Sequence, residues 1–345
     1  MPYVPPELIS SDAFLKLDRI AQLLPSSVTD FFGFECLLGS EAPTADFLIC
    51  SRVRHGSREV LAAWQPDVEL SPSADSIWLR LRRFAQEWTN AQSPLYNNVH
   101  NLWLEFDVDP ASTHVPPPNV FIGSDSLCAP DSVASDSSWL PRTALPMLLG
   151  HQVSRQTIAV ISRCVNSLPS YGHIFQVGLM LARSSAAVRL CIRGLSGAGI
   201  PDYLVAIGWD GCMRDVKELI DSFTPITQSV DLDVDVIDRV LPKVGLELYP
   251  GNGMSRLHLL VDHLVSAGLC TPCKAAALRS WPGMAEVEHK TFRRSLHHIK
   301  VVLTSDVPLL AKAYLGVHEN RIVRLNAAPA ALTRGGDELA PRKLP

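Results

Sequence analysis

The stretch VDLDVDVIDRVLPKVGLELY, residues 230–249, contains two segments in which apolar and polar residues alternate. Alternation with a period of two is typical of β-strands that have one apolar and one polar face. The two segments span residues 228–237 and 242–249, and the short connection between them predicts an antiparallel hairpin. This hairpin is the local unit from which the rest of the fold can be inferred.

The same kind of unit occurs five times along the chain. Four further pairs of strand-like segments lie at 31–39 with 45–54, 99–109 with 119–123, 173–183 with 187–194, and 297–304 with 311–318. Segments with helical periodicity precede the five hairpins, at 10–24, 76–91, 142–167, 202–223, and 254–268 with 272–280. Because hairpins pair antiparallel, helices that alternate with hairpins exclude a doubly wound parallel sheet. The pattern predicts an α+β protein with five α-β-β units.

Ten antiparallel strands can close into a β-barrel, which removes exposed strand edges and places the helices in an outer ring. We expect one barrel domain over residues 1–325, with an open two-lobed α+β sandwich as the alternative. RIAQLLPSS at 19–27 matches RCVNSLPSY at 163–171, which suggests an internal duplication of about 10–125 and 152–320. Residues 326–345, rich in Ala, Pro, Gly and charge, are expected to form a disordered tail.

Composition narrows the class of protein. The 345 residues are 47% hydrophobic and 19% charged, a balance that supports a sizeable core. The net charge of -4 and the lack of a long basic run argue against a nucleic-acid partner. No leader-like segment and no long apolar run occurs, so we expect a cytoplasmic protein without a membrane partner. Cys270 and Cys273 form the one spaced cysteine motif, in which Pro272 more simply marks the start of a helix.

The polar alternates of the strands should point into the barrel lumen, because the opposite faces must be apolar to pack on the helices. The lumen would mix charged and aromatic side chains, as the lining of a ligand cavity does. A half-exposed open sheet, with these residues facing water, is the alternative. The candidate site residues on this face are Glu35, Arg52, Trp103, Glu105, Asp107, Arg189, Asp231, Asp233, Glu247, Tyr249, His298, Lys300, Lys312 and Tyr314.

Five helix-hairpin units around a ten-stranded barrel resemble the aromatic prenyltransferases of the ABBA, or prenyltransferase-barrel, family. The resemblance covers residues 10 to about 320 as a pattern. AKAYLG at 311–316 is similar to the Lys-x-Tyr strand motif with which that family grips an allylic diphosphate. LWLEFD at 102–107 is similar to the family's strand that opens the second hairpin, and GFEC at 33–36 places a glutamate where the family anchors its aromatic acceptor.

The resemblance implies transfer of an isoprenoid from an allylic diphosphate to an aromatic small molecule or peptide in natural product biosynthesis. Charge-assisted hydrogen bonds from arginine and lysine would bind the diphosphate, tyrosine rings would shield the allylic cation, and carboxylates would orient and deprotonate the acceptor. Those roles would fall to Arg52, Arg189, Lys300 and Lys312; to Tyr249 and Tyr314, with Trp103 as a further substrate contact; and to Glu35, Glu105 and Glu247.

The sequence departs from the family pattern where an acidic residue stands in place of a lysine. Glu247-x-Tyr249 stands where a second Lys-x-Tyr would be expected, and the alternating aspartates at 231–235 add further acid. Either Mg²⁺ bridges carboxylates to the diphosphate, or the barrel is a metal-dependent hydrolase that uses Zn²⁺ or Mn²⁺. A barrel that only binds a ligand is a third reading, and the oligomeric state is not predicted. The candidate metal ligands are Asp107, Asp231, Asp233 and His298.

Overall fold

A computed structural model gives the fold of the chain. It describes residues 2–29, 31–53, 56–64, 72–109, 115–128, 137–183, 185, 187–251, 253–287 and 290–319. The predicted tail at 326–345 lies outside the described residues, and the predicted duplication stays a prediction. Among the helices in these ranges, none is both long and apolar enough to cross a membrane.

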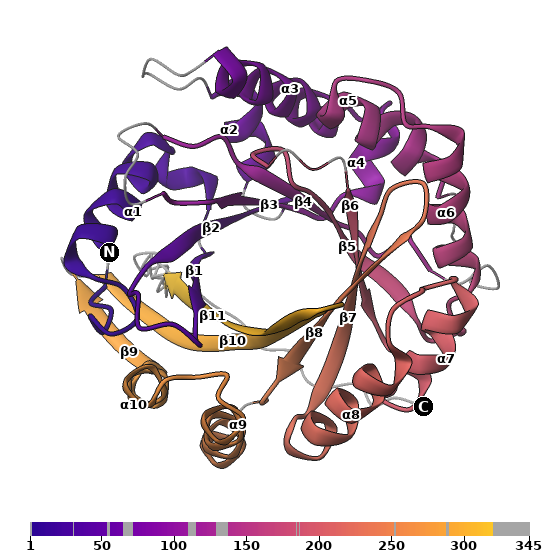
Figure 1. Cartoon of the computed structure of the whole chain (residues 1–345). Helices are drawn as coiled ribbons and strands as arrows, with labels where there is room; N and C mark the ends of the chain where they lie inside the picture. The colour runs from indigo at the N-terminus through magenta and orange to yellow at the C-terminus, as the bar shows by residue number, and fades with distance from the viewer. Residues whose placement is uncertain are drawn as a thin grey trace, which may run out of the picture.

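Ten strands form one closed antiparallel barrel (Figure 1). Neighbours in sequence pair in order from β1 to β8, β8 then pairs with β10, and β11 closes the ring by pairing with both β10 and β1. The strands are β1 (Phe31–Leu37), β2 (Ala45–Arg52), β3 (Asn101–Phe106), β4 (Asn119–Gly123), β5 (His173–Leu179), β6 (Val188–Arg193), β7 (Ser229–Val236), β8 (Val240–Tyr249), β9 (Gly283–Val287), β10 (Lys290–Thr304) and β11 (Val307–Glu319).

The helices lie outside this ring of strands, as Figure 1 shows. They are α1 (Ser11–Leu23), α2 (Ser57–Ala63), α3 (Pro72–Thr89), α4 (Pro94–Asn98), α5 (Leu145–Leu149), α6 (Arg155–Asn166), α7 (Gly199–Ala206), α8 (Met213–Phe223), α9 (Met254–Ser266) and α10 (Pro272–Ser280). Each of the five hairpins follows at least one helix, so the order is five α-β-β units. The predicted fold class, a ten-stranded antiparallel barrel surrounded by helices in five α-β-β units, is confirmed by the strand order.

The core lies between the helices and the outer face of the barrel. On β3, Leu102, Leu104 and Phe106 are fully buried in this core, whereas Trp103 and Glu105 point to the lumen. Burial of one such apolar side chain contributes about 1.5–3 kcal/mol. The same alternation holds on the other barrel strands, which fixes the register because a one-residue slip would turn apolar side chains inward.

The structure differs from the sequence prediction in its helices and at one strand. The helix predicted over 142–167 is broken into two. A π-helical turn (Leu140–Ala144) continues into α5, which ends at Gly150 with a φ of 78°. The side chain of Ser154 then caps the start of α6. Glycine adopts this left-handed conformation without steric cost, so the chain reverses there. The sequence reading also missed the short helices α2 and α4.

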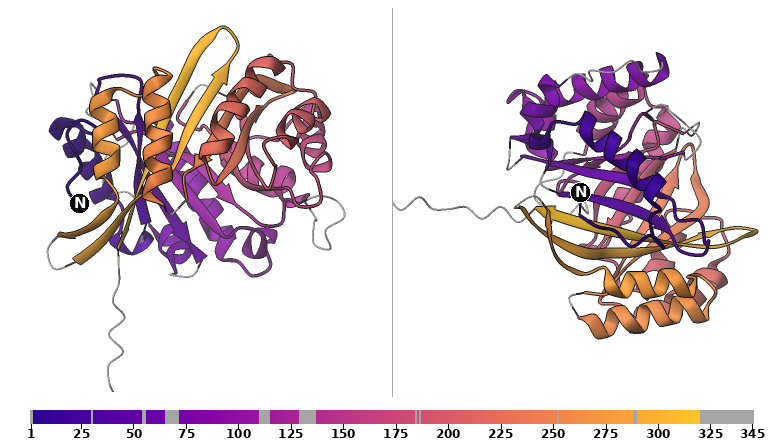
Figure 2. Two further views of the ribbon diagram at one scale, coloured as in Figure 1. Left: turned by 90° about the horizontal axis from the view of Figure 1, so that it is seen from below. Right: turned by 90° about the vertical axis from the view of Figure 1, so that its left-hand side faces the viewer.

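The strand β9 and the first part of β10 were not predicted either. They pair with each other from Gly283 to Arg294, beyond the segment of β10 that pairs with β8. Figure 2 shows this pair extending from one end of the barrel and the turn between β10 and β11 extending from the other. Their side chains are mostly exposed, so the alternation of apolar and polar residues that marks a half-buried strand is weak here.

The motif at Cys270 and Cys273 has the structural role that the sequence favours. Thr271 caps α10 and Pro272 lies in its first turn. Lys274 is fully buried, and its ammonium donates hydrogen bonds to the carbonyls of Leu37, at 2.6 Å, and Ala42, at 2.8 Å. Lys274, the residue after the motif, therefore tethers α10 to the β1–β2 hairpin.

Candidate active site

One end of the lumen, where β1 ends and β2 begins, is filled by ion pairs. Glu35 accepts hydrogen bonds from the Lys312 ammonium and the Tyr314 hydroxyl, and it is 4% exposed. Burial alone would raise the pKa of Glu35, but the charge of Lys312 and these two hydrogen bonds lower it to about 2. Glu35 is therefore ionised, and each of its carboxylate oxygens already accepts a hydrogen bond from a lumen side chain.

A second group of acids lies beside Glu35. Arg183 donates to both oxygens of Asp107, at 2.6 and 2.5 Å, and reaches Glu105 at 3.4 Å. Burial and the negative charge of Glu35 raise the pKa of Glu105 to about 8 and that of Asp46 to about 7. At neutral pH Glu105 therefore keeps its proton, because it has too little positive charge nearby.

A third ion-pair group is formed at the same end by β6, β7 and β8. Arg189 forms a bidentate pair with Asp235, at 2.8 and 3.1 Å, and Lys243 lies 3.4 Å from the same carboxylate. Burial would raise the pKa of Asp235, but the Arg189 charge and its hydrogen bonds lower it to about 2. These charges hold neighbouring strands together and leave no free cation in this group.

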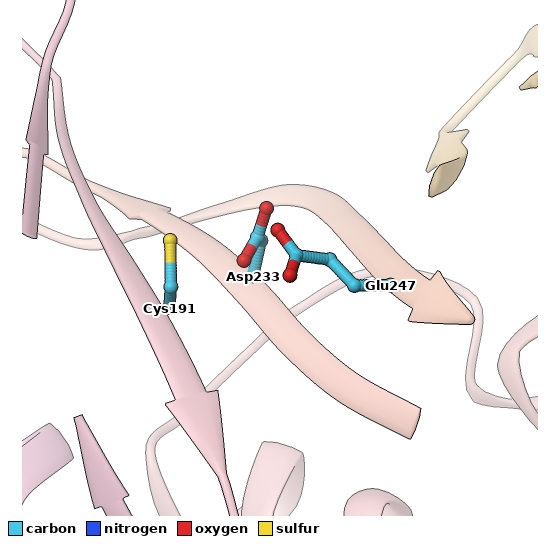
Figure 3. A group of neighbouring side chains, drawn as sticks. All are labelled: Cys191, Asp233 and Glu247. Atoms are coloured by element: carbon cyan, nitrogen blue, oxygen red, sulfur yellow. The ribbon is translucent and has the colours of Figure 1, made fainter. Parts of the chain in front are cut away.

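Nearer the middle of the lumen, three side chains from adjacent strands converge. Cys191 of β6, Asp233 of β7 and Glu247 of β8 each offer an atom within 4.8 Å of the others (Figure 3). Lys300 donates to Asp233, and its ammonium lies 3.8 Å from Glu247. One carboxylate oxygen of Asp233, Oδ1, is buried without a hydrogen-bond partner.

At the opposite end, where β1 begins and β8 ends, a hydrogen-bond network surrounds Glu247. Arg193 donates to Asp231 at 2.7 and 2.9 Å and to the Tyr249 hydroxyl at 3.2 Å, and that hydroxyl donates to Glu247 at 2.8 Å. Burial raises the pKa of Asp231 to about 6 although Arg193 opposes the shift. The hydroxyl of Tyr249, a neutral donor, thus fixes the position of the Glu247 carboxyl group.

Two histidines border Glu247 on its other side. The Nδ1 atoms of His297 and His298 are 2.8 Å apart, so one ring donates to the other, and Nε2 of His298 lies 3.7 Å from Glu247. The His298 ring stacks on Tyr314 with centroids 4.2 Å apart. Burial, together with the neighbouring His297 and Lys300, holds the pKa of His298 well below its usual value, so the ring is neutral.

A cavity of about 220 Å³ opens between these groups inside the barrel. Six aromatic side chains line it, together with two carboxyl groups, two basic side chains and two histidines. The aromatic residues are Phe31, Trp103, Phe121, Phe175, Tyr249 and Tyr314. Trp103 packs edge-on against Phe31 with centroids 5.3 Å apart. The arrangement suits a flat apolar ligand with a small number of polar groups.

The predicted site residues lie in the lumen as expected, but they divide between the cavity and the ion pairs. Half of them line the cavity: Trp103, Glu105, Glu247, Tyr249, His298, Lys300 and Tyr314. The other half do not: Glu35, Arg52, Asp107, Arg189, Asp231, Asp233 and Lys312. Glu35, which the resemblance assigns to the acceptor, is bound by Lys312 and Tyr314, so Glu247 and Glu105 are the carboxyl groups that face the open space.

Sequence reasoning missed several lumen residues. Asp46 could have been found, because it lies four residues before Cys50 on β2 and so shares the inward face of that strand. Phe31 is the first residue of β1 and shares the inward face with Glu35. His297 lines the cavity through a shift of register in β10 next to His298, a feature with no clear sequence signal.

The predicted metal ligands do not gather in one place. Asp107 and Asp231 are bound by arginines at opposite ends of the lumen, whereas Asp233 and His298 both lie beside Glu247. Within the part of the chain that the structure describes, the groups able to hold an ion are Cys191 with Asp233 and Glu247, and Glu35 with Asp46 and Glu105. The first has an unpartnered ligand oxygen on Asp233, and the donor set suits Zn²⁺; the second has both oxygens of Glu35 already bound.

Comparison with known proteins gives structural neighbours only. No protein-family model matches the chain. No curated protein matches it in sequence. The chain is similar to 5-dimethylallyltryptophan synthase from Streptomyces coelicolor, at 15% identity over 89% of this chain and 92% of that one, with a TM-score of 0.48.

Two further solved structures are similar to the chain. Prenyltransferase PriB in its apo form matches at 14% identity over 82% of this chain and 79% of that one, with a TM-score of 0.48. AnaPT from Neosartorya fischeri matches at 13% identity over 82% and 77%, with a TM-score of 0.46. Because these identities and TM-scores are low, the barrel is inferred from the strand pairing described above. An activity is inferred from the cavity of this chain.

Proposed function

We propose that the chain is an enzyme that transfers an isoprenoid from an allylic diphosphate to an aromatic acceptor inside the barrel. The observation that carries the proposal is the lumen cavity, which is lined by six aromatic side chains and by the buried carboxyl group of Glu247. A carbocation is stabilised by the negative faces of aromatic rings, and the rings that line this cavity supply them.

The chemistry balances with groups present in the cavity. The bond between the allylic carbon and the diphosphate oxygen breaks, the electron pair leaves with the diphosphate, and the allylic cation is stabilised by ring faces such as Tyr249 and Trp103. The acceptor forms the new bond, and the proton it loses passes to a base. Glu247 lines the cavity and already accepts a hydrogen bond from Tyr249, which leaves its second oxygen facing His298 and Lys300.

Positive charge for the diphosphate is scarce. Among the lumen arginines and lysines that the structure describes, Arg52 is the one without a carboxylate partner; its guanidinium lies over Phe31, 5.6 Å from the ring centre. We propose that the diphosphate lies near Arg52 and Arg193, at the end of the lumen where β1 begins. Mg²⁺ bound by diphosphate oxygens and a lumen carboxylate would offset the acid there.

Transfer is tested by incubating the protein with dimethylallyl or geranyl diphosphate and a panel of indoles, phenols and aromatic peptides, with Mg²⁺ and with EDTA. Mass spectrometry should detect an acceptor that has gained one isoprenoid unit, and diphosphate should be released in equal amount. A Glu247→Gln variant should lose most of this activity, whereas Glu286→Gln, on the exposed strand β9, should keep it. Binding without turnover for every acceptor would point to a ligand-binding barrel instead.

Metal-dependent hydrolysis of a peptide or other small natural product is the second candidate. The converging atoms of Cys191, Asp233 and Glu247 favour it, because thiolate and carboxylate together bind Zn²⁺. A bound Zn²⁺ or Mn²⁺ would supply an activated water, and Lys300 would have to move away from Asp233. Elemental analysis of the purified protein separates the two functions: one tightly bound metal ion per chain, lost in Cys191→Ala, would favour hydrolysis.

A further inference from the structure

The two cationic side chains that line the cavity are both hydrogen-bonded to aspartates rather than to the cavity's own carboxyl groups. They are Arg193 and Lys300, which are bound to Asp231 and Asp233 respectively. Glu247 is 6% exposed, and in the described part of the chain its nearest cationic nitrogen, that of Lys300, is 3.8 Å away and donates elsewhere. A buried carboxyl group whose nearest ammonium is hydrogen-bonded to another acid favours a ligand that brings positive charge.

A second carboxyl group of the cavity has the same shortage. Glu105 is 4% exposed and lines the cavity, while Arg183, its nearest cation, makes two short contacts to Asp107 and reaches Glu105 only at 3.4 Å. Burial and the charge of Glu35 therefore raise the pKa of Glu105 to about 8. The cavity thus presents one carboxyl group, that of Glu247, whose nearest ammonium donates to another acid, and a second, that of Glu105, which a nearby cation would ionise.

Aromatic rings and unpartnered polar atoms complete this environment. Trp103, Phe121 and Tyr249 line the same cavity, and the faces of such rings attract cations. His298, 6% exposed, has its Nε2 atom buried without a hydrogen-bond partner at the cavity wall beside Glu247, and the side-chain oxygen of Asn101 is buried without a partner there as well. These atoms are independent signs of a polar group that is meant to enter the site.

We propose that the ligand of this cavity is an aromatic compound that carries a positively charged nitrogen, and that Glu247 is its counter-ion. The proposal rests on the proposed function, since it names the chemical class of the acceptor for that same cavity. The aromatic walls favour an organic cation over a metal ion, because a metal ion gains little from ring faces and would have to displace Lys300 from Asp233.

Two near-isosteric indoles test the proposal without any prenyl donor. Tryptamine ends in an ammonium group and tryptophol in a hydroxyl group, and both are titrated calorimetrically into the purified full chain with EDTA present. We expect tryptamine to bind at least about tenfold more tightly than tryptophol. Glu247→Gln should remove most of this difference by weakening tryptamine alone, and the exposed control Glu286→Gln should leave both affinities unchanged.

Equal affinities for the two indoles in the wild-type protein would overturn the proposal, and so would a preference for tryptamine that survives in Glu247→Gln. In a parallel titration without EDTA, Zn²⁺ that binds more tightly than tryptamine and displaces it, with loss of both effects in Cys191→Ala, would assign the site to a metal instead. If Glu247→Gln fails to fold, the wild-type comparison of the two indoles decides alone. Transfer of a prenyl group to tryptophol as readily as to tryptamine would contradict this inference and leave the proposed function intact, whereas tight tryptamine binding without transfer to any acceptor would do the reverse.

Discussion

The two ends of the lumen are built from the same strands and the same alternation, yet one is occupied by ion pairs and the other holds a cavity. Where β1 ends, Lys312 and Arg189 span the space between strands and meet Glu35 and Asp235. Where β1 begins, Phe31 and Trp103 turn flat rings toward each other and leave room between the walls. Inward alternation therefore selects which side chains face the lumen, while pairing between long charged side chains selects where the lumen is occupied by ion pairs.

The largest effect on the free energy of unfolding is expected from breaking an ion pair at the end of the lumen where β1 ends. Lys312→Met leaves Glu35 buried and ionised without its cation, which should lower the free energy of unfolding by about 3–5 kcal/mol in urea titrations. The double variant Glu35→Gln with Lys312→Met should recover most of that loss, because no buried charge remains. The matched control is Lys290→Met, whose partner Glu319 lies at 3.2 Å on an exposed part of β10 and β11, with an expected cost of at most about 1 kcal/mol.

If Lys312→Met lowers the free energy of unfolding no more than Lys290→Met does, charge pairing does not hold the strands together at the end of the lumen where β1 ends. The comparison of the two ends would then have to rest on side-chain volume alone.

A smaller change in the free energy of unfolding is expected with pH, because the pKa values of Glu105 and Asp46, the acids beside Glu35, are raised. The folded chain keeps the proton of Glu105 up to about pH 8, whereas the unfolded chain releases it near the usual pKa of 4.5. The folded state therefore binds more protons between these values, so the free energy of unfolding should fall as pH rises from about 5 to 8. Asp46, with its pKa raised to about 7, acts in the same direction.

The variant Glu105→Gln should flatten this dependence, which amounts to at most about 1.4 kcal/mol per pH unit for one proton. Urea midpoints measured at several pH values for the wild type and the variant give the two slopes. Parallel slopes would mean that Glu105 does not hold the extra proton. Glu35 works in the opposite sense, because its lowered pKa stabilises the fold above about pH 4.5 and that stability is lost as pH falls toward 2.

The smallest effect on stability is expected at the open end. Arg52→Gln removes a guanidinium that no carboxylate of the described chain binds, so the free energy of unfolding should change by less than about 0.5 kcal/mol. Affinity for a dimethylallyl diphosphate analogue should nevertheless fall about tenfold, since a charge-assisted contact to the diphosphate is lost. Calorimetry on the variant checks both the retained fold and the weaker binding; unchanged affinity would move the diphosphate away from Arg52.

Strand alternation was sufficient to predict the fold and the inward face. Glu105 and Glu247 sit among apolar alternates on their strands, so their lumen position followed from the sequence with no knowledge of the neighbours. What the sequence could not supply was the partner of each charge. That Lys312 binds Glu35, or that Arg183 reaches back from beyond β5 to Asp107, depends on strands that are distant in sequence and on side-chain conformation.

The division of the candidate residues into cavity and ion pairs was invisible for the same reason. Lys300 and Lys312 have the same residue type and the same alternation, but one lines the cavity and the other does not. The predicted helix at 142–167 failed because Gly150 ends it in a left-handed conformation that the surrounding apolar residues conceal.

The closure of the barrel by β1 and β11 also sets the order in which the chain can fold. Glu35 and Tyr314, which pair across this seam, are 279 residues apart in sequence. During synthesis β1 must wait, with one edge unpaired, until nearly the whole described chain has been made. Contacts of such long range are formed slowly, so we infer that closing the seam is a late step and that chains ending before Val307 would expose the edges of β1 and β10 to aggregation.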